Sequence, residues 1–242
     1  MNISTTSNTV LITGATRGLG RETASRLAAL DWTIWVGARD PEAGEKVAAG
    51  IAADHPTAAV RAVQLDVADE ESVRRAIDTV RAARTGLDVL VNNAGISGRF
   101  VSPEETTPAD FREVYATNVV GPVVVTNTFL PLLRESAAPR LVMVSSGMGS
   151  FGVTTDPDRL ESTMIGLAYP SSKSALNMIT TMYAKAMPDM RVVAIDPGYT
   201  ATGLNRHQGQ QTLSEGTDAI VQACTAKEVP GTFIDRYGIA SW

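Results

Sequence analysis

Short runs of apolar, β-branched residues alternate along this chain with longer segments in which apolar residues recur every three or four positions. Runs that stay apolar throughout are typical of strands buried on both faces of a sheet. The pattern predicts seven strands, at residues 10–13, 33–38, 60–65, 87–93, 140–145, 191–196 and 232–234. Helical segments lie between them, and strands alternating with helices predict a parallel sheet covered on both faces.

No change of composition, linker or internal repeat interrupts this alternation, so residues 1–242 are predicted to form one domain. A chain of this length can bury a substantial core. The predicted fold class is therefore α/β, with a doubly wound, mostly parallel seven-stranded sheet.

Charge and composition exclude several classes of function. The formal net charge of -5, with lysines and arginines scattered, argues against a nucleic-acid-binding surface. A single cysteine, Cys224, excludes an intramolecular disulfide, and the two distant histidines predict no metal site. The polar N-terminus does not resemble a signal peptide, and the longest apolar tract, 119–133, is too short and polar to span a membrane. We therefore expect a soluble, cytoplasmic protein.

A glycine-rich turn, TGATRGLG, directly follows the first predicted strand. Its three glycines permit a sharp turn and a close approach of backbone amides to a pyrophosphate, and the following helix adds partial positive charge. The spacing differs from G-x-G-x-x-G, and a tight strand-to-helix turn without a ligand is the alternative. The position at the first strand–helix junction favours a nucleotide site. The residues expected to contact the nucleotide here are Gly14, Thr16, Arg17, Gly18, Leu19 and Gly20.

Two arginines indicate which nucleotide is bound. The second predicted strand closes at Ala38 and is followed by Arg39, whereas an NAD site usually has an acidic residue there. Asp40 is expected outside the strand, at the start of the next helix before Pro41. Arg39 and Arg17 can hold a 2′-phosphate by charge-assisted hydrogen bonds, the alternative being two solvated arginines. The sequence therefore predicts NADP(H).

Further motifs follow in a fixed order: LDV at 65–67, NNAG at 92–95, NVVG at 118–121, VSSGMG at 144–149, YPSSK at 169–173 and DPGYTAT at 196–202. Together with the glycine-rich turn they resemble the short-chain dehydrogenase/reductase family. The resemblance extends from about residue 9 to the C-terminus and is greatest to the NADPH-dependent carbonyl reductases of that family. It implies a single-domain Rossmann fold, and the spacing in YPSSK disfavours the related enoyl reductases.

The resemblance implies a catalytic group of four residues, Asn118, Ser146, Tyr169 and Lys173, with Ser145 as the alternative to Ser146. Tyr169 would exchange the proton. A free tyrosine, with a pKa of about 10, suits that task poorly near neutral pH, so Lys173 and an oxidised nicotinamide ring are expected to stabilise its phenolate. Ser146 would donate a hydrogen bond to the substrate oxygen, and Asn118, in a helix from about 110 to 133, would anchor a water.

Each of these residues also has a structural alternative. A tyrosine and a lysine four residues apart are compatible with a packed ring beside a solvated amine. Asn118 is compatible with a helix–helix contact, and Ser146 with a cap at the end of a strand. Their joint occurrence after a nucleotide loop favours the catalytic interpretation.

The same resemblance implies further contacts to the cofactor, including contacts of Tyr169 and Lys173 with the nicotinamide ribose. The other matched positions are Asp66 and Val67 at the adenine, Asn92, Ala94 and Gly95 along the adenosine ribose, and Pro197, Gly198, Thr200 and Thr202 at the nicotinamide carboxamide.

The expected function is NADPH-dependent reduction of a ketone or aldehyde to an alcohol. The alternatives are an NAD(P)+-dependent alcohol dehydrogenase working in the oxidative direction and a non-enzymatic NADP(H)-sensing protein. A small, mostly apolar carbonyl or alcohol substrate is expected, in a pocket built from residues 95–100, the segment after Ser146 and residues 204–214. The resemblance implies a homodimer or homotetramer, and no nucleic-acid or membrane partner is expected.

Ser146 and Tyr169 are 23 residues apart, farther than in many family members. The additional residues lie in the polar stretch 150–168. They predict an inserted loop or short helix beside the mouth of the active site, which would shape substrate access or block one oligomer interface.

Overall fold

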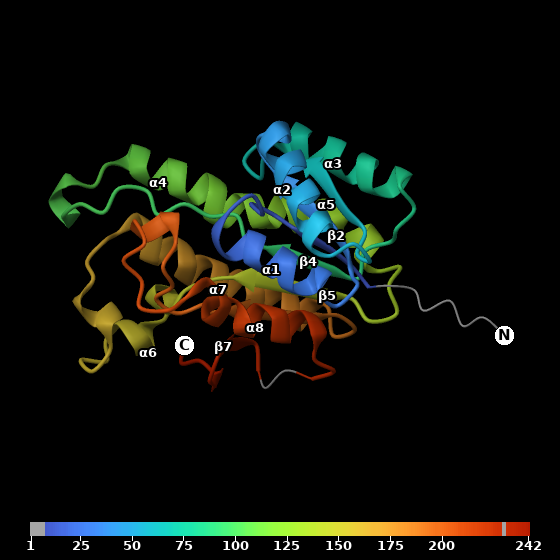
Figure 1. Ribbon diagram of the computed structural model, residues 1–242. Helices are drawn as coiled ribbons and strands as arrows, with labels where there is room; N and C mark the ends of the chain where they lie inside the picture. Colours follow the sequence, from blue (N-terminus) through green and yellow to red (C-terminus); the bar gives the residue numbers. More distant parts are fainter. Residues whose placement is uncertain (1–7, 229–230) are drawn as a thin grey trace.

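One sheet of eight strands, in the order β3-β2-β1-β4-β5-β6-β7-β8, runs through the protein (Figure 1). The structure is a computed structural model that describes residues 8–228 and 231–242. Strands β1 to β7 pair in parallel, and β8 pairs antiparallel to β7. The strands are β1 (Thr9–Ile12), β2 (Thr33–Ala38), β3 (Val60–Gln64), β4 (Val89–Asn92), β5 (Arg140–Val144), β6 (Arg191–Ile195), β7 (Phe233–Asp235) and β8 (Gly238–Ile239).

Helices cover both faces of the sheet, which confirms the predicted doubly wound, single-domain α/β fold. One core packs strand residues against α1 (Gly18–Ala28), α2 (Pro41–Asp54) and α8 (Leu213–Thr225). The other core packs the opposite faces of the strands against α3 (Glu70–Ala82), α5 (Gly121–Leu133) and α7 (Ala168–Ala186). The central strands are buried on both sides, which is why their sequences are apolar throughout.

The predicted sheet had seven strands, and the eighth is a small correction. It comprises two residues, too few to produce a readable pattern in the sequence. The chain turns back after β7 because Gly238 adopts a φ of 131° and the Asp235 carboxylate accepts hydrogen bonds from the amides of Tyr237 and Gly238. The β7–β8 pair is thus a tight hairpin at the sheet edge.

The helix predicted from about 110 to 133 is continuous but not uniform. It begins as α4 (Pro108–Tyr115), passes through a π-helical turn, η2 (Ala116–Val120), and continues as α5. By length and composition alone, Pro108–Leu133 is long and apolar enough to cross a membrane. Residues such as Val125 and Phe129 are fully buried in the protein core, and core helices of soluble proteins pass the same test.

The stretch between Ser146 and Tyr169 contains a short helix, α6 (Phe151–Thr154), as predicted. The short 3₁₀ turns η3 (Gly147–Gly149) and η4 (Leu160–Thr163) lie on either side of it, and two more are η1 (Pro103–Glu105) and η5 (Gly203–Asn205). Figure 1 shows the C-terminal end of the chain beside α6, where the Gly152 amide donates to the carbonyl of Trp242.

Candidate active site

The glycine-rich turn joins β1 to α1 in a conformation that requires its glycines. Gly14 has a φ of 62°, and a Cβ atom there would lie 2.9 Å from the Cα of Ala94. Gly18 has a φ of 55°, and a Cβ atom there would lie 3.9 Å from the side chain of Thr202, at van der Waals distance. Two segments expected to bind the cofactor, at Ala94 and Thr202, therefore lie beside this turn.

The turn fits a pyrophosphate. Helix α1 begins at Gly18, and no side chain of the described residues caps its N-terminus. The amides of its first turn are thus available to an anion, and the helix dipole favours negative charge there. The remaining turn residues expected to contact the nucleotide, Thr16 and Leu19, are half-buried beside it.

Two exposed arginines are expected to hold a cofactor phosphate, Arg17 at the N-cap of α1 and Arg39 at the end of β2. Arg39 directly follows the last residue of the strand, Ala38. Neither Arg39 nor Arg17 forms an ion pair or a side-chain hydrogen bond with the other described residues. Asp40 lies outside the strand and caps α2, accepting from the amides of Glu42 and Ala43. Its carboxylate is therefore engaged by the helix.

The residues after β4 separate into two groups. Ala94 and Gly95 lie by the glycine-rich turn and by Lys173, respectively. The side chain of Asn92, in contrast, is buried in the core and donates to Thr126 Oγ1 at 3.0 Å. The expected cofactor contact of Asn92 is thus limited to its backbone.

Asn93 was not among the predicted residues, although it belongs to the same NNAG motif. Its side-chain amide donates to the carbonyls of Thr13 and Gly14, at 2.8 and 3.2 Å. The Thr13 hydroxyl in turn accepts from the amides of Asn93 and Ala94. Asn93 therefore fixes the glycine-rich turn to the end of β4.

Asp66 and Val67, expected near the adenine, follow β3 at the same edge of the sheet. The Asp66 carboxylate accepts from the amide of Ala68, and its own amide donates to Ser72 Oγ. Val67 is buried against Gly121, where an added Cβ would lie 3.0 Å from Val67.

Ser146 and Tyr169 meet through their side chains. A hydrogen bond from Ser146 lowers the pKa of Tyr169, but the larger effect is burial, which raises the pKa of that phenol to about 12. Ser145, the alternative candidate, is buried, and its hydroxyl donates a hydrogen bond to Asn177 Oδ1 on α7. The geometry therefore favours Ser146 as the residue that reaches the reacting oxygen.

Lys173 lies one helical turn after Tyr169 on α7 and is 4% exposed. Its Nζ donates to the Val144 carbonyl at 2.8 Å and lies 5.7 Å from the centroid of the Tyr169 ring. Burial lowers the pKa of this amine to about 8. Lys173 is expected to lower the pKa of Tyr169, but burial is the largest effect on that phenol and raises its pKa.

Asn118 is fully buried within the π-helical turn η2. Its Oδ1 accepts from the Ile96 amide at 2.9 Å, and its Nδ2 donates to the Ile96 carbonyl and to Ser172 Oγ. Ser172 also donates to the Tyr169 carbonyl, so it connects η2 to the start of α7. Sequence reasoning missed Ser172, and its only signal was its place within YPSSK.

The segment after β6 turns toward the glycine-rich turn. Gly198 has a φ of 69°, and the buried Thr200 donates its hydroxyl to the carbonyl of Pro197. Thr202 caps η5 and approaches Gly18. The four residues expected at the nicotinamide thus form one loop facing the nucleotide turn.

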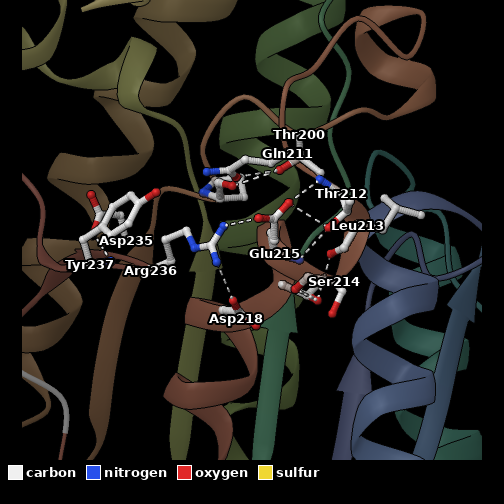
Figure 2. A network of polar contacts seen from close by, with 12 residues as sticks. Thr200, Gln211, Thr212, Leu213, Ser214, Glu215, Asp218, Asp235, Arg236 and Tyr237 are labelled. Carbon is white, nitrogen blue, oxygen red and sulfur yellow. Dashed lines mark hydrogen bonds and ion pairs between the residues drawn. The ribbon is translucent and has the colours of Figure 1, made fainter.

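A polar network holds the far end of this loop, where α8 begins (Figure 2). Glu215 forms a capping box with Thr212 and an ion pair of 3.0 Å with Arg236. The Thr212 backbone amide and the Arg236 guanidinium lower the pKa of Glu215 to about 2. Arg236 also reaches Asp218, so the β7–β8 hairpin is tied to α8.

Apolar side chains lie next to Tyr169. The ring of Phe100 is 6.0 Å from the Tyr169 ring, centroid to centroid, and Gly166 of the inserted stretch packs against it. Phe100 is 45% exposed, Leu204 43% and Phe151, in the segment after Ser146, 76%. All three segments expected to form the substrate pocket thus present exposed apolar groups.

Comparison with known proteins agrees with this geometry. The family model for short chain dehydrogenases matches residues 8–213. The chain is 37% identical to the short-chain dehydrogenase anuI of Penicillium roqueforti over 236 residues, covering 93% of each chain. It is 27% identical to the (+)-neomenthol dehydrogenase of Arabidopsis thaliana, covering 96% of this chain and 97% of the relative.

Among solved structures, NADPH-bound carbonyl reductase from chicken fatty liver is similar, with a TM-score of 0.84 and 28% identity. The match covers 98% of this chain and 99% of the chicken chain. The fold, the ordered site residues and these matches together show that the chain belongs to the short-chain dehydrogenase/reductase family of nicotinamide-dependent oxidoreductases.

Proposed function

We propose that this protein is an NADP(H)-dependent reductase that converts a ketone or aldehyde to an alcohol. The observation that supports it is the meeting of Tyr169 and Ser146 beside Lys173, at the edge of the sheet where the glycine-rich turn lies. A bound NADPH supplies the hydride. The exposed Arg17 and Arg39 would hold its 2′-phosphate, since Asp40 is engaged in capping α2.

The side chains divide the remaining work. Tyr169 donates its phenolic proton to the substrate oxygen as negative charge develops there, and Ser146 donates a hydrogen bond to the same oxygen. Lys173, which lies near Tyr169, would bind the ribose of the nicotinamide. Asn118 and Ser172 hold the start of α7, the helix that carries Tyr169.

The pKa of Tyr169 in the protein alone agrees with a role as proton donor. A phenol whose pKa is raised to about 12 is protonated at neutral pH and can donate its proton to a carbonyl oxygen. Alcohol oxidation needs the phenolate, which the positive ring of a bound oxidised cofactor would stabilise, so the oxidative reaction is the second candidate.

Replacing Tyr169 with Phe tests the proposal. We expect NADPH-dependent carbonyl turnover to fall by about 100-fold or more, because the proton donor is lost, while the dissociation constant of NADPH changes less than about twofold. Turnover is measured as the loss of NADPH absorbance with a panel of apolar ketones and aldehydes, and binding by titration.

Tyr183→Phe is the matched control. Tyr183 lies on the same helix and donates to Asn127, away from the catalytic group. Its loss should leave turnover nearly unchanged. Substantial turnover by the Tyr169 variant, or tight NADPH binding by the unaltered protein with no turnover of any compound, would contradict the proposed function.

A further inference from the structure

Asp196 is a buried carboxylate to which none of the roles above has been given. It follows β6 and precedes the loop expected at the nicotinamide, and it is 4% exposed. Burial raises the pKa of this group, and hydrogen bonds from the amides of Gly198 and Gly147 oppose that effect. An ionisable group this deeply buried needs partners to offset its lost hydration.

The two partners of Asp196 belong to different loops. Its Oδ1 accepts from the Gly198 amide at 3.0 Å, in the loop expected to receive the nicotinamide. The same carboxylate accepts from the amide of Gly147, the residue directly after Ser146. One side chain therefore connects the segment that carries Ser146 to the segment that faces the cofactor.

The approach to Gly147 is close enough to restrict the residue there. A Cβ atom at position 147 would lie 2.7 Å from Asp196 Oδ2 and 3.3 Å from Glu161 Oε1. Any side chain at this position would push the carboxylate away or move the loop. The glycine in the motif VSSGMG is thus explained by its contact with Asp196.

Asp196 lines a cavity of about 100 Å³ between η4, the nicotinamide loop and the β7–β8 hairpin. The other charged residues of this cavity are Arg159, Glu161, Asp235 and Arg236. Arg159 pairs with Glu161, and Arg236 pairs with Glu215 and Asp218. No arginine is paired with Asp196 among the described residues, so its defined partners are the two loop amides.

We infer that Asp196 is a positioning residue, which fixes Ser146 relative to the loop at Gly198 and so sets the distance between the polarised carbonyl and the hydride donor. The inference rests on the proposed function, because it assumes that Ser146 contacts the substrate oxygen. Small errors in such a distance are costly, since catalysis depends on reacting atoms held close and aligned.

The test is Asp196→Asn, which keeps the shape of the side chain. The substitution replaces one of the two carboxylate oxygens with an NH₂ group, which cannot accept a hydrogen bond from a backbone amide. We expect kcat to fall by about 10- to 100-fold, with KM and the NADPH dissociation constant within about twofold. With NADPH deuterated at the transferred position, the isotope effect on kcat should increase, because hydride transfer becomes slower than product release.

Asp235→Asn is the matched control. Asp235 lines the same cavity, but among the described residues its carboxylate accepts only from the amides of its own turn, at Tyr237 and Gly238 (Figure 2). Its kcat should remain within about twofold of the unaltered protein. Equal losses in both variants would indicate a general effect of cavity charge and would overturn the positioning role.

Hydrogen exchange gives a readout that does not depend on activity. In Asp196→Asn, the amides of Gly147 and Gly198 should exchange faster, while those of β5 and β6 stay protected. If Asp196→Asn does not fold, Gly147→Ala disturbs the same contact from the other loop and should lower kcat in the same way. Unchanged kcat and unchanged exchange would overturn the inference.

The outcomes separate this inference from the proposed function. If the unaltered protein reduces no carbonyl compound, the proposed function fails and the exchange experiment still tests the two hydrogen bonds. If the unaltered protein is active and Tyr169→Phe is inactive, an unchanged kcat in Asp196→Asn rejects the positioning role alone.

Discussion

At the scale of single residues, Tyr169 is held in its protonated form by its surroundings. Burial is the main cause, and the hydrogen bond from Ser146 opposes it only in part. Lys173 donates to the Val144 carbonyl, so its charge is directed at the backbone of β5. The protein alone therefore favours a proton donor, and a base would require a further positive charge at the phenol.

Arg39 is the residue whose replacement should change cofactor preference. In Arg39→Asp, the ratio of kcat/KM for NADPH to that for NADH should fall by about 10-fold or more, because a charge-assisted hydrogen bond to the 2′-phosphate is lost. The ratio is measured with both cofactors at one fixed carbonyl concentration.

Arg134→Asp makes the same change of charge at the C-cap of α5 and serves as the control. It should leave the ratio unchanged. A ratio that stays constant in Arg39→Asp would reject the assignment of NADP(H) from this position.

At the scale of elements, α7 contains a destabilising group in its first turns. Lys173 is buried, and its pKa falls from 10.5 to about 8. Below pH 8 the folded protein holds a buried charge, which costs about 3 kcal/mol of stability. Between pH 8 and 10.5 the unfolded chain binds a proton that the folded protein has released, so stability should rise with pH across that window.

Lys173→Met should remove this dependence. The variant should be more stable than the unaltered protein at pH 7, and the difference should shrink by about 3 kcal/mol on going to pH 10. Urea unfolding at the two pH values measures it, and Lys185→Met, at an exposed position on the same helix, is the control. A difference that is equal at both pH values would contradict the expected titration.

The π-helical turn η2 shows why one element of the site lay beyond sequence reasoning. Residues 108–133 have a helical pattern, and the structure confirms the start and end of the predicted helix to within about two residues. A single widened turn adds no periodic signal, yet it brings Asn118 to the backbone of Ile96. Such turns often occur at functional sites, which agrees with the place of Asn118.

At the scale of the whole molecule, the inserted stretch and the C-terminal segment hold one another in place. The Gly152 amide donates to the Trp242 carbonyl, and the Trp242 ring lies 5.0 Å from that of Phe233 in β7. A Cβ atom at position 152 would lie 2.8 Å from the Trp242 carbonyl oxygen and closer still to Ser241 Oγ. This contact therefore tolerates no side chain.

Gly152→Ala should loosen the C-terminal segment. We expect a lower melting temperature and faster hydrogen exchange at Ala240, whose amide donates to Phe233. Gly50→Ala is the matched control, because an added Cβ there meets no atom within 4 Å and alanine favours the helix. Equal effects in the two variants would contradict the proposed contact.

Much of the fold could be predicted from the sequence, because buried parallel strands leave unbroken apolar runs. The strand at Thr33–Ala38 was predicted to the residue. The motifs also predicted that Ser146, Tyr169 and Lys173 would come together. The roles of Asn93, Ser172 and Asp196 could not be predicted, since each depends on a hydrogen bond to a residue far away in the sequence.

The short hairpin at β8 limits how the molecule can aggregate. A sheet edge presents unpaired amides and carbonyls that can capture a strand of another chain. At this edge the outermost strand is two residues long, so an incoming strand finds little backbone to pair with. At the other edge, β3 carries the exposed Arg61, whose charge discourages pairing. Both ends of the sheet are thus protected against growth, and the concentrated protein should resist fibrillar association.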